Sequence, residues 1–215
     1  MPLSFISKIT VGLAIMAALF TGCDKAMEGA KKVFNAEAGR STETASRPRV
    51  NAVTASASVI PQGWCSLKFE PSVGPKLTLP KTQLLNQGKT TGEHPRWVNM
   101  WATWCKPCIA ELPHILSWHK AKLGTGTDIN LELLSIDEDE KVLQAFMTRR
   151  PELAAIKQQR MVNPSELEEF AKSLGLDEDT TVPIHIFTDR QDHIVCVRTG
   201  GIADTDLGVV RELLK

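Results

Sequence analysis

The sequence lacks a net charge, an internal repeat and an apolar segment long enough to cross a membrane. Its 215 residues carry 25 Lys and Arg against 25 Asp and Glu, and no basic arm stands out. The charge balance therefore gives no reason to expect binding to nucleic acid. The main apolar run covers residues 9–20, whereas a bilayer-spanning helix needs about 20 apolar residues. The absence of a recurring unit argues against a repeat architecture.

The apolar run near the N-terminus fits the core of an export signal instead. Lys8 precedes it, and two small residues lead to Cys23, as in a leader that is cleaved. Residues 19–23 (LFTGC) resemble the lipobox of bacterial lipoproteins, with Phe20 where that motif usually has Leu. The resemblance implies that residues 1–23 are a signal peptide ending at the lipobox, and that Cys23 is lipidated. A buried N-terminal helix is the alternative.

Residues 24–60 shift in composition towards Ala, Ser, Thr, Lys and Glu, with Phe34 as their one aromatic residue. Such a stretch has too little apolar surface to offset the entropy lost on ordering, so we predict a flexible tether. Asp24 looks like the signal that keeps lipoproteins in the inner membrane of enteric-type bacteria. We therefore expect a protein held by its lipid on the periplasmic face of the inner membrane, with one domain at residues 61–215.

Residues 61–215 alternate between strand-like and helical patterns. Compact apolar runs indicate strands, and apolar residues at helical spacing indicate helices. This alternation, which ends in a hairpin and a helix, predicts an α/β fold with a central mixed sheet and helices on both faces. Residues 155–162 are unusually polar for a strand, and their structure stays open. The expected strands are 96–102, 129–136, 184–187 and 194–197, and the expected helices are 107–123, 137–150, 164–174 and 204–214.

Local signals predict where the helices begin and end. Gly124 stops the first helix, and Gly175 ends the third in a left-handed C-cap. Asp137, with Glu140 three residues later, has the spacing of a capping box for the second helix. Asn163 is the expected N-cap of the third helix, ahead of a first-turn proline.

The segment from Trp101 to Cys108 (WATWCKPC) places two thiols where the first strand passes into the first helix. Cys105 falls at the helix N-terminus, where unpaired N–H groups and the helix dipole stabilise a thiolate. Cys108, one turn further on, is placed to resolve a mixed disulfide formed by Cys105. Pro107 fits the first turn because its missing N–H has no intrahelical acceptor there. Lys106 is either a solvated surface lysine or a further stabiliser of the thiolate.

Three other uses of the Cys-x-x-Cys pair compete with this interpretation. A zinc site needs two further ligands, and the five histidines form no second paired cluster. A permanent structural disulfide is the second, and it is an unusual one at a helix start. A solitary peroxidatic cysteine is the third, and it would not need the adjacent resolving thiol. The intact pair favours thiol-disulfide exchange without a metal or cofactor.

These residues resemble the thioredoxin superfamily, and within it the membrane-anchored, extracytoplasmic branch typified by the TlpA and ResA proteins. Residues 99–102 (NMWA) precede the motif as Asn-Phe-Trp-Ala does in that branch, and Pro113 stands where thioredoxins have a helix-kinking proline. Gly200–Gly201 matches a glycine that lets the chain pass close to the active site. The resemblance covers about residues 61–215. It implies a thioredoxin-like fold with Trp104 as part of the active-site motif.

Asn99 and Glu111 bear on proton transfer. The resemblance places Asn99 where thioredoxin itself has a buried aspartate that exchanges protons with the second cysteine. Glu111 matches an acidic residue of the ResA type, and it lies three residues after Cys108 on the same helical face. We expect Glu111 to take over the handling of the proton. A surface glutamate without such a role is the alternative.

The run from Thr181 to Pro183 (TVP) is the second signature of the resemblance. In thioredoxin folds a cis proline at this place faces the active-site disulfide, and the backbone of the preceding residue pairs with the substrate. The resemblance gives these roles to Pro183 and Val182. Ile184 and His185 depart from the small hydroxyl residue that the family often places next. We expect substrate fit to differ accordingly.

Cys65 and Cys196 remain once Cys23 is lipidated and the motif is paired. An oxidising compartment favours a disulfide between them, and some members of the TlpA and ResA branch tie an N-terminal segment to the last strands in this way. Two separate buried thiols are the alternative, because free cysteine is often buried. Cα atoms more than about 7 Å apart would exclude the bond.

The resemblance implies a protein-disulfide oxidoreductase that acts on disulfides or dithiols of other proteins. We expect a reductase of extracytoplasmic proteins, with apocytochrome c or a metallochaperone as examples of its substrates. A membrane thiol-electron donor of the DsbD or CcdA type would reduce it again. A dithiol oxidase is one alternative, because reduction potentials in this fold span about −270 to −120 mV. A redox-inactive chaperone or metal carrier on the same fold is the other.

Overall fold

The computed structural model describes residues 60–89 and 92–215. The predicted signal peptide, the lipidation site at Cys23 and all of the predicted tether except its last residue therefore lie outside the described residues. Within the described ranges, no helix is both long enough and apolar enough to cross a membrane.

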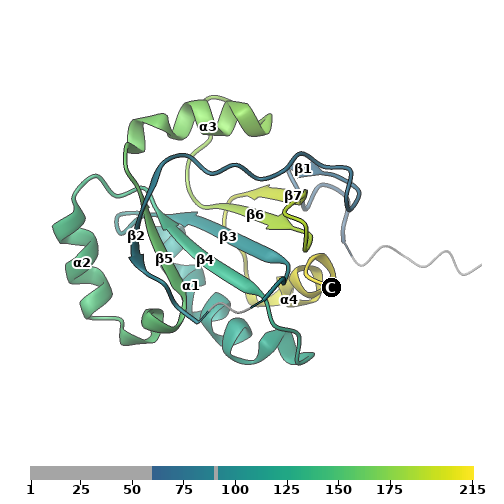
Figure 1. Ribbon diagram of the computed structural model, residues 1–215, viewed down its shortest axis with the longest axis horizontal. Coiled ribbons are helices and arrows are strands. Elements are labelled where there is room, and N and C mark those ends of the chain that lie inside the picture. Colours follow the sequence, from purple (N-terminus) through teal and green to yellow (C-terminus); the bar gives the residue numbers. More distant parts are fainter. Residues whose placement is uncertain (1–59, 90–91) are drawn as a thin grey trace, which may run out of the picture. The chain divides into compact units, whose positions relative to one another are not determined.

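The strands of the described residues form one seven-stranded mixed sheet in the order β1-β7-β6-β3-β4-β5-β2 (Figure 1). The central strands β3, β4 and β5 are parallel, and β6 pairs antiparallel with both β3 and β7. This is the mixed sheet that the sequence predicts. The strands are β1 Leu67–Lys68, β2 Thr82–Asn86, β3 Arg96–Trp101, β4 Asn130–Ser135, β5 Lys157–Met161, β6 Ile184–Thr188 and β7 Ile194–Thr199.

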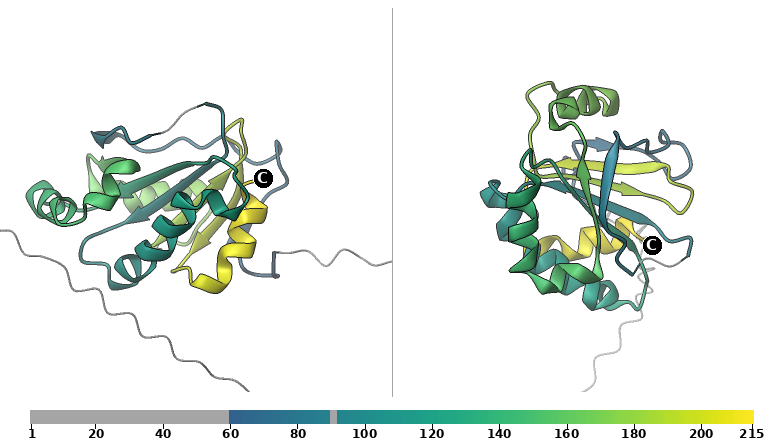
Figure 2. Two further views of the ribbon diagram at one scale, coloured as in Figure 1. Left: turned by 90° about the horizontal axis from the view of Figure 1, so that it is seen from below. Right: turned by 60° about the vertical axis from the view of Figure 1, so that its left-hand side comes forward.

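Helices cover both faces of the sheet. α1 joins β3 to β4 and α2 joins β4 to β5, and right-handed crossovers in one direction put both helices on the same face. α4 lies on that side as well, and α3 lies on the other (Figure 2). The α-helices are α1 Lys106–Lys120, α2 Glu140–Thr148, α3 Leu167–Leu174 and α4 Leu207–Leu213, and the 3-10 turns are η1 Lys122–Gly124, η2 Pro151–Ala155, η3 Pro164–Glu166 and η4 Asp204–Asp206.

Aromatic rings hold α1 against the sheet. Trp97 of β3 stacks on Phe187 of β6 with ring centroids 5.3 Å apart, and on Trp118 of α1 with centroids 6.4 Å apart. All three rings are buried, and such pairs add about 0.5–1.5 kcal/mol beyond the burial itself.

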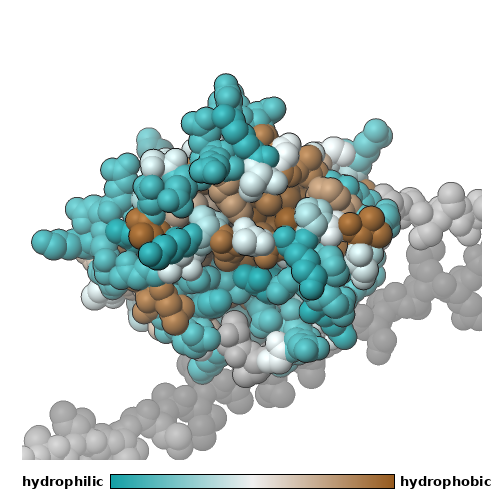
Figure 3. All heavy atoms as spheres, turned by 45° about the horizontal axis from the view of Figure 1, so that its top comes forward, coloured by the Kyte–Doolittle hydropathy of each residue, from teal (hydrophilic) through white to brown (hydrophobic). Residues whose placement is uncertain are grey.

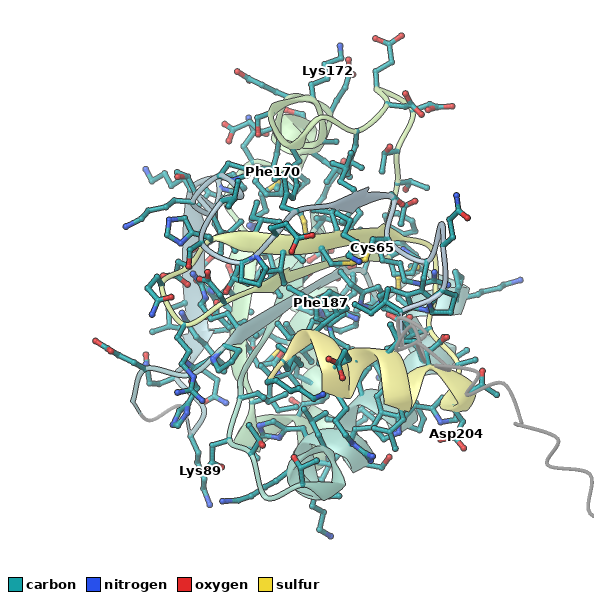
Figure 4. The ribbon with its side chains drawn as sticks, turned by 90° about the vertical axis from the view of Figure 1, so that its right-hand side faces the viewer. Cys65, Lys89, Phe170, Lys172, Phe187 and Asp204 are labelled. Atoms are coloured by element: carbon teal, nitrogen blue, oxygen red, sulfur yellow. A yellow bond between two sulfur atoms is a disulfide. The ribbon has the colours of Figure 1, made fainter. Side chains whose placement is uncertain are left out.

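On the other face, Phe170 lies on the side of α3 towards the sheet and Lys172 points outward (Figure 4). Apolar side chains that remain exposed gather in a patch among hydrophilic residues (Figure 3).

The first helix ends earlier than predicted. α1 stops at Lys120, because Lys122 and Leu123 adopt positive φ angles of 47° and 55° that no right-handed helix allows. Gly124 also has a positive φ, of 70°, but it closes the short η1 turn and not the helix. The strain at the two non-glycine residues is held by packing, since Leu123 is buried.

The predicted capping box of the second helix is wrong. Asp139, not Asp137, is the N-cap of α2, and its carboxylate accepts the first-turn N–H groups of Lys141 and Val142. Asp137 is buried and accepts the backbone N–H of Thr103 at 3.0 Å, so it holds the segment before the Cys-x-x-Cys pair. α2 therefore begins two residues later than predicted, and Val142 in its first turn is 50% exposed.

The third helix also begins later than its signals predict. Pro164 opens the η3 turn, and within the described residues Asn163 makes no side-chain cap to it. α3 starts at Leu167 and ends as predicted at Gly175, whose φ of 90° is left-handed.

The polar stretch after residue 155 contains an unpredicted strand, β5, between β4 and β2. Gln158 and Gln159 are buried there because their amides find partners. Gln159 donates to Glu132 at 2.8 Å and accepts from Thr82 of β2 at 2.8 Å. Gln158 donates to the carbonyl of Leu153 at 3.1 Å. Polarity therefore does not exclude a buried strand when each polar group is satisfied.

Glu132 is a buried charge that ties three strands together. Its carboxylate bonds Arg96 of β3 at 3.0 Å and lies 3.2 Å from the ammonium of Lys157 of β5. Burial lowers the pKa of Arg96, but the carboxylates of Glu132 and Asp192 outweigh this effect and raise it. The pairing lets the charge sit in the sheet without an unmatched cost.

A disulfide joins Cys65 to Cys196 of β7, as the sequence predicts, with Cα atoms 5.6 Å apart. β1 extends the sheet beside this bond, and Figure 4 shows Cys65 next to the strands. Trp64 adds two contacts of its own. Its indole donates to Asp206 at 2.9 Å, and the Arg198 guanidinium lies 4.6 Å from its ring centroid. The segment that leads in from the N-terminus is therefore fixed to the last strand and the last helical segment.

Replacing Cys65 and Cys196 together by Ala should lower the free energy of unfolding by up to about 5 kcal/mol. The bond closes a loop with a sequence separation of 131 residues, so its loss restores much entropy to the unfolded chain. Urea unfolding followed by circular dichroism measures the effect. The matched control is the Cys105 and Cys108 double Ala variant, which opens a loop with a separation of only 3 and should lose much less. Equal losses in the two variants would contradict the prediction.

Candidate active site

Cys105 lies at the N-cap of α1, in the extended conformation that a cap requires. Its Sγ accepts the N–H of Cys108 at 3.3 Å and is joined to the Cys108 sulfur in a disulfide. Cys105 is 4% exposed, and Cys108 is fully buried. α1 is 15 residues long, so its free N–H groups and its dipole act on the outer sulfur. The predicted difference between an attacking and a resolving thiol has a structural basis.

Exposed residues surround the outer sulfur. Trp104 is 62% exposed, and Lys106 and Pro107 are also on the surface. Trp104 lines a surface hollow of about 730 Å³ together with Val142 and Pro164. The site therefore offers an apolar ring beside a sulfur that is only slightly accessible.

The second signature meets the first in space. The peptide bond between Val182 and Pro183 is cis, as the resemblance implies. The carbonyl oxygen of Val182 lies 3.7 Å from Cys105 Sγ. Gly200, with a left-handed φ of 87°, donates its N–H to the Pro183 carbonyl at 2.9 Å. Gly201 passes so close to α1 that a Cβ added there would lie 3.4 Å from the Glu111 carboxylate.

Glu111 is buried on the inner face of α1, with 2% of its surface exposed. Its Oε1 accepts from Asn99 Nδ2 at 2.8 Å, and its Oε2 accepts the N–H of Ile202 at 2.9 Å. His185 Nε2 lies 3.3 Å from the same Oε2. The alternative of a surface glutamate is wrong. The carboxylate sits one helical turn after Cys108, held by three other parts of the chain.

His185 is the part of this cluster that sequence reasoning missed. It is fully buried, it pairs with Asn99 across β6 and β3, and its Nδ1 lies 3.3 Å from the indole nitrogen of Trp97. Its departure from the family pattern was the visible signal. Alternation along β6 also places it on the same face as Phe187, towards α1, and a histidine in that apolar strand needs polar partners.

The described residues contain no group of three or more His, Cys, Asp or Glu side chains that could hold a metal ion. The cysteine pair itself is closed as a disulfide.

No family model and no curated protein sequence matches the chain. Solved structures do. A thiol-disulfide isomerase from Corynebacterium glutamicum superposes with a TM-score of 0.51 at 17% identity, over 66% of this chain and 97% of that one. This chain has a thioredoxin-like fold. StoA from Bacillus subtilis (TM-score 0.44, 16% identity, 61% and 96% coverage) and a DsbF homologue from Corynebacterium diphtheriae (0.45, 19%, 69% and 99%) also match.

The fold explains why the cysteine pair and the cis proline lie close together. The cysteine pair follows the central strand β3, and the cis proline precedes the neighbouring strand β6. Adjacent antiparallel strands bring the end of β3 to the start of β6. Two motifs that are more than 70 residues apart thus meet where the central strand β3 ends and β6 begins.

Replacing Asn99 by Asp tests the contact with Glu111. The substitution removes the donor at 2.8 Å and brings two buried carboxyl groups together, which cannot both ionise. The folded variant then keeps a proton that the unfolded chain releases, so its free energy of unfolding should fall between about pH 5 and about pH 8. Urea unfolding at both pH values measures this. Asn99→Leu, which adds no carboxyl group, is the control, and equal pH trends in the two variants would contradict the contact.

Proposed function

We propose that the protein is an extracytoplasmic thiol-disulfide oxidoreductase that reduces disulfides in other proteins through Cys105 and Cys108. One observation carries the proposal. A sulfur at the mouth of α1 accepts a helix N–H, is bonded to a second, buried sulfur, and faces the Val182 carbonyl before a cis proline. The Corynebacterium glutamicum protein of the same fold is named a thiol-disulfide isomerase, a name that belongs to the same class of reaction.

The reduced protein would act in two exchange steps. The Cys105 thiolate attacks one sulfur of the substrate disulfide, which forms a mixed disulfide and releases the other substrate sulfur as a thiolate. The Cys108 thiolate then attacks Cys105 Sγ, which frees the second substrate sulfur and forms the Cys105–Cys108 disulfide. The substrate gains two electrons and the protein loses two.

Glu111 would handle the proton of the buried thiol. Cys108 is fully buried, so its S–H has no solvent to receive the proton when it becomes the nucleophile. The Glu111 carboxylate is one helical turn away and is also buried. It accepts the proton of Cys108 as the second exchange begins and passes it to the departing substrate thiolate. Proton transfer of this kind commonly contributes about 10²-fold or more to a rate.

Substrate would bind across the surface beside Cys105. The exposed Trp104 ring would offer apolar contact, and the Val182 backbone would pair with an extended substrate segment, the role that the resemblance gives it. Lys106 and Pro107 form the outer rim of the site. The neighbouring hollow leaves room for a side chain that flanks the substrate disulfide.

The opposite direction, dithiol oxidation, is the second candidate. Val182 before the proline favours it, because this residue also occurs in oxidases of the fold. Lys106-Pro107 resembles the reducing members and favours reduction. The direction of the reaction depends on the reduction potential of the cysteine pair relative to that of its partners. The redox state of the partner in cells therefore shows which direction operates.

The anchoring that we propose rests on the N-terminal sequence. Cys23 would carry the lipid, residues 24–60 would act as the tether, and a membrane donor of the DsbD or CcdA type would reduce the pair again. The domain would then work on the periplasmic face of the inner membrane.

Replacing Cys23 by Ala should release the protein from the membrane, because the lipid is attached through that sulfur. Fractionation of cells and labelling with radioactive palmitate measure the effect. Cys65→Ala leaves the lipobox intact and is the control. A Cys23→Ala protein that stays in the membrane fraction would contradict the proposed anchor.

Replacing Cys105 by Ser should abolish reduction of insulin disulfides by the purified protein, because the attacking thiolate is lost. Replacing Cys108 by Ser should leave the first step intact and accumulate a mixed disulfide with the partner in cells, which mass spectrometry identifies. A partner that becomes oxidised when the protein is absent indicates a reductase, and one that becomes reduced indicates an oxidase. Reduction that survives Cys105→Ser would contradict Cys105 as the attacking thiol, and wild-type protein that reduces no insulin would favour a redox-inactive binding module.

A further inference from the structure

His185 is a buried histidine that the exchange steps do not use. It is fully buried in β6, among the aromatic rings of Trp97 and Phe187. A polar ring in that position loses its hydration, and this cost is offset only by specific hydrogen-bond partners. The identity of those partners shows what the ring can do.

Two donors decide which nitrogen of His185 carries hydrogen. Trp97 Nε1 lies 3.3 Å from His185 Nδ1, and an indole N–H can only donate. Asn99 Nδ2 lies 3.3 Å from the same nitrogen. Nδ1 is therefore the acceptor, and a neutral ring carries its hydrogen on Nε2.

The Nε2–H faces the carboxylate of Glu111. It lies 3.3 Å from Oε2 and has no well-aligned hydrogen-bond acceptor among the described residues. Oε2 also accepts from Ile202, and Oε1 accepts from Asn99. The groups that contact the carboxylate are thus all donors.

The other charged side chains near this pair have partners elsewhere. Arg198, which stands opposite His185 in β7, donates to two backbone oxygens. His114, one turn further along α1 than Glu111, pairs with Asp204 at 3.5 Å. Among the described residues, His185 is the one basic side chain in contact with the Glu111 carboxylate.

We propose that His185 is a positioning residue that holds Glu111 in place for proton exchange with Cys108, an inference that rests on the proposed function. Trp97 fixes the tautomer, His185 directs its N–H to Oε2, and Asn99 and Ile202 hold the rest of the carboxylate. The proton moves from the Cys108 thiol to Glu111 and then to the departing substrate thiolate. No bond to His185 forms or breaks.

A double-mutant cycle tests this role. His185→Phe keeps a ring but removes both nitrogens, and it should slow insulin reduction at neutral pH on the order of tenfold, because the carboxylate loses a donor that lies 3.3 Å away. The acidic limb of its pH–rate profile should move to higher pH, because the carboxylate has lost a donor. In a Glu111→Gln background the same substitution should have no further effect on the rate or the profile.

Trp118→Phe is the matched control. Trp118 stacks on Trp97 but makes no contact with the His185 and Glu111 pair in the described hydrogen bonds, so its loss tests packing alone. This variant should keep the wild-type pH profile. A shift equal to that of His185→Phe would overturn the proposal, because general loosening of the core would then explain both.

Further outcomes separate this proposal from the function on which it rests. If Glu111→Gln reduces insulin as fast as the wild type, the proton role in the proposed function fails. Suppose instead that Glu111→Gln is slow. The positioning role alone fails if His185→Phe leaves the rate and the pH profile of the wild type unchanged. It also fails if His185→Phe slows the Glu111→Gln variant as much as it slows the wild type. His185→Gln keeps a donor and an acceptor and covers the case in which Phe prevents folding. A folded Gln variant should keep the acidic limb, and its loss would overturn the proposal.

Discussion

The buried carboxylate of Glu111 is the interaction on which the site depends. A charge placed inside a sheet and helix layer must be met by donors, and here the donors come from β3, from β6 and from the loop before η4. The same carboxylate belongs to α1, the helix that carries the cysteine pair. Satisfying one charge therefore fixes the active-site helix to the strand before it and to the segment that carries the cis proline.

The two sulfurs differ because they stand at different depths of one helix. Cys105 is the cap and meets the N–H of the first turn, where a thiolate is stabilised without any charged neighbour. Cys108 is inside the first turn, fully buried, and one helical turn before Glu111. In the proposed mechanism the outer, slightly accessible sulfur is therefore assisted by the backbone, and the fully buried sulfur by a proton acceptor.

The second disulfide has a separate task. It binds the entering chain to β7, and Trp64 extends the attachment to Asp206 and Arg198. The attachment is made on β7 itself, and Gly200, which directly follows that strand, donates its N–H to the Pro183 carbonyl.

The sequence by itself determined what is local. The spacing of Cys105 and Cys108 at a strand-to-helix junction, the left-handed stop at Gly175 and the apolar central strands all depend on neighbouring residues, and they stand in the structure as predicted. Tertiary structure alone decided which polar groups are buried. Asp137 is not a helix cap but accepts a hydrogen bond from Thr103. Gln158 and Gln159 lie buried in a strand, and His185 contacts Glu111. The physical reason is that a polar group is tolerated in the core only where it has a hydrogen-bond partner. Those partners come from strands and loops that are distant in the chain.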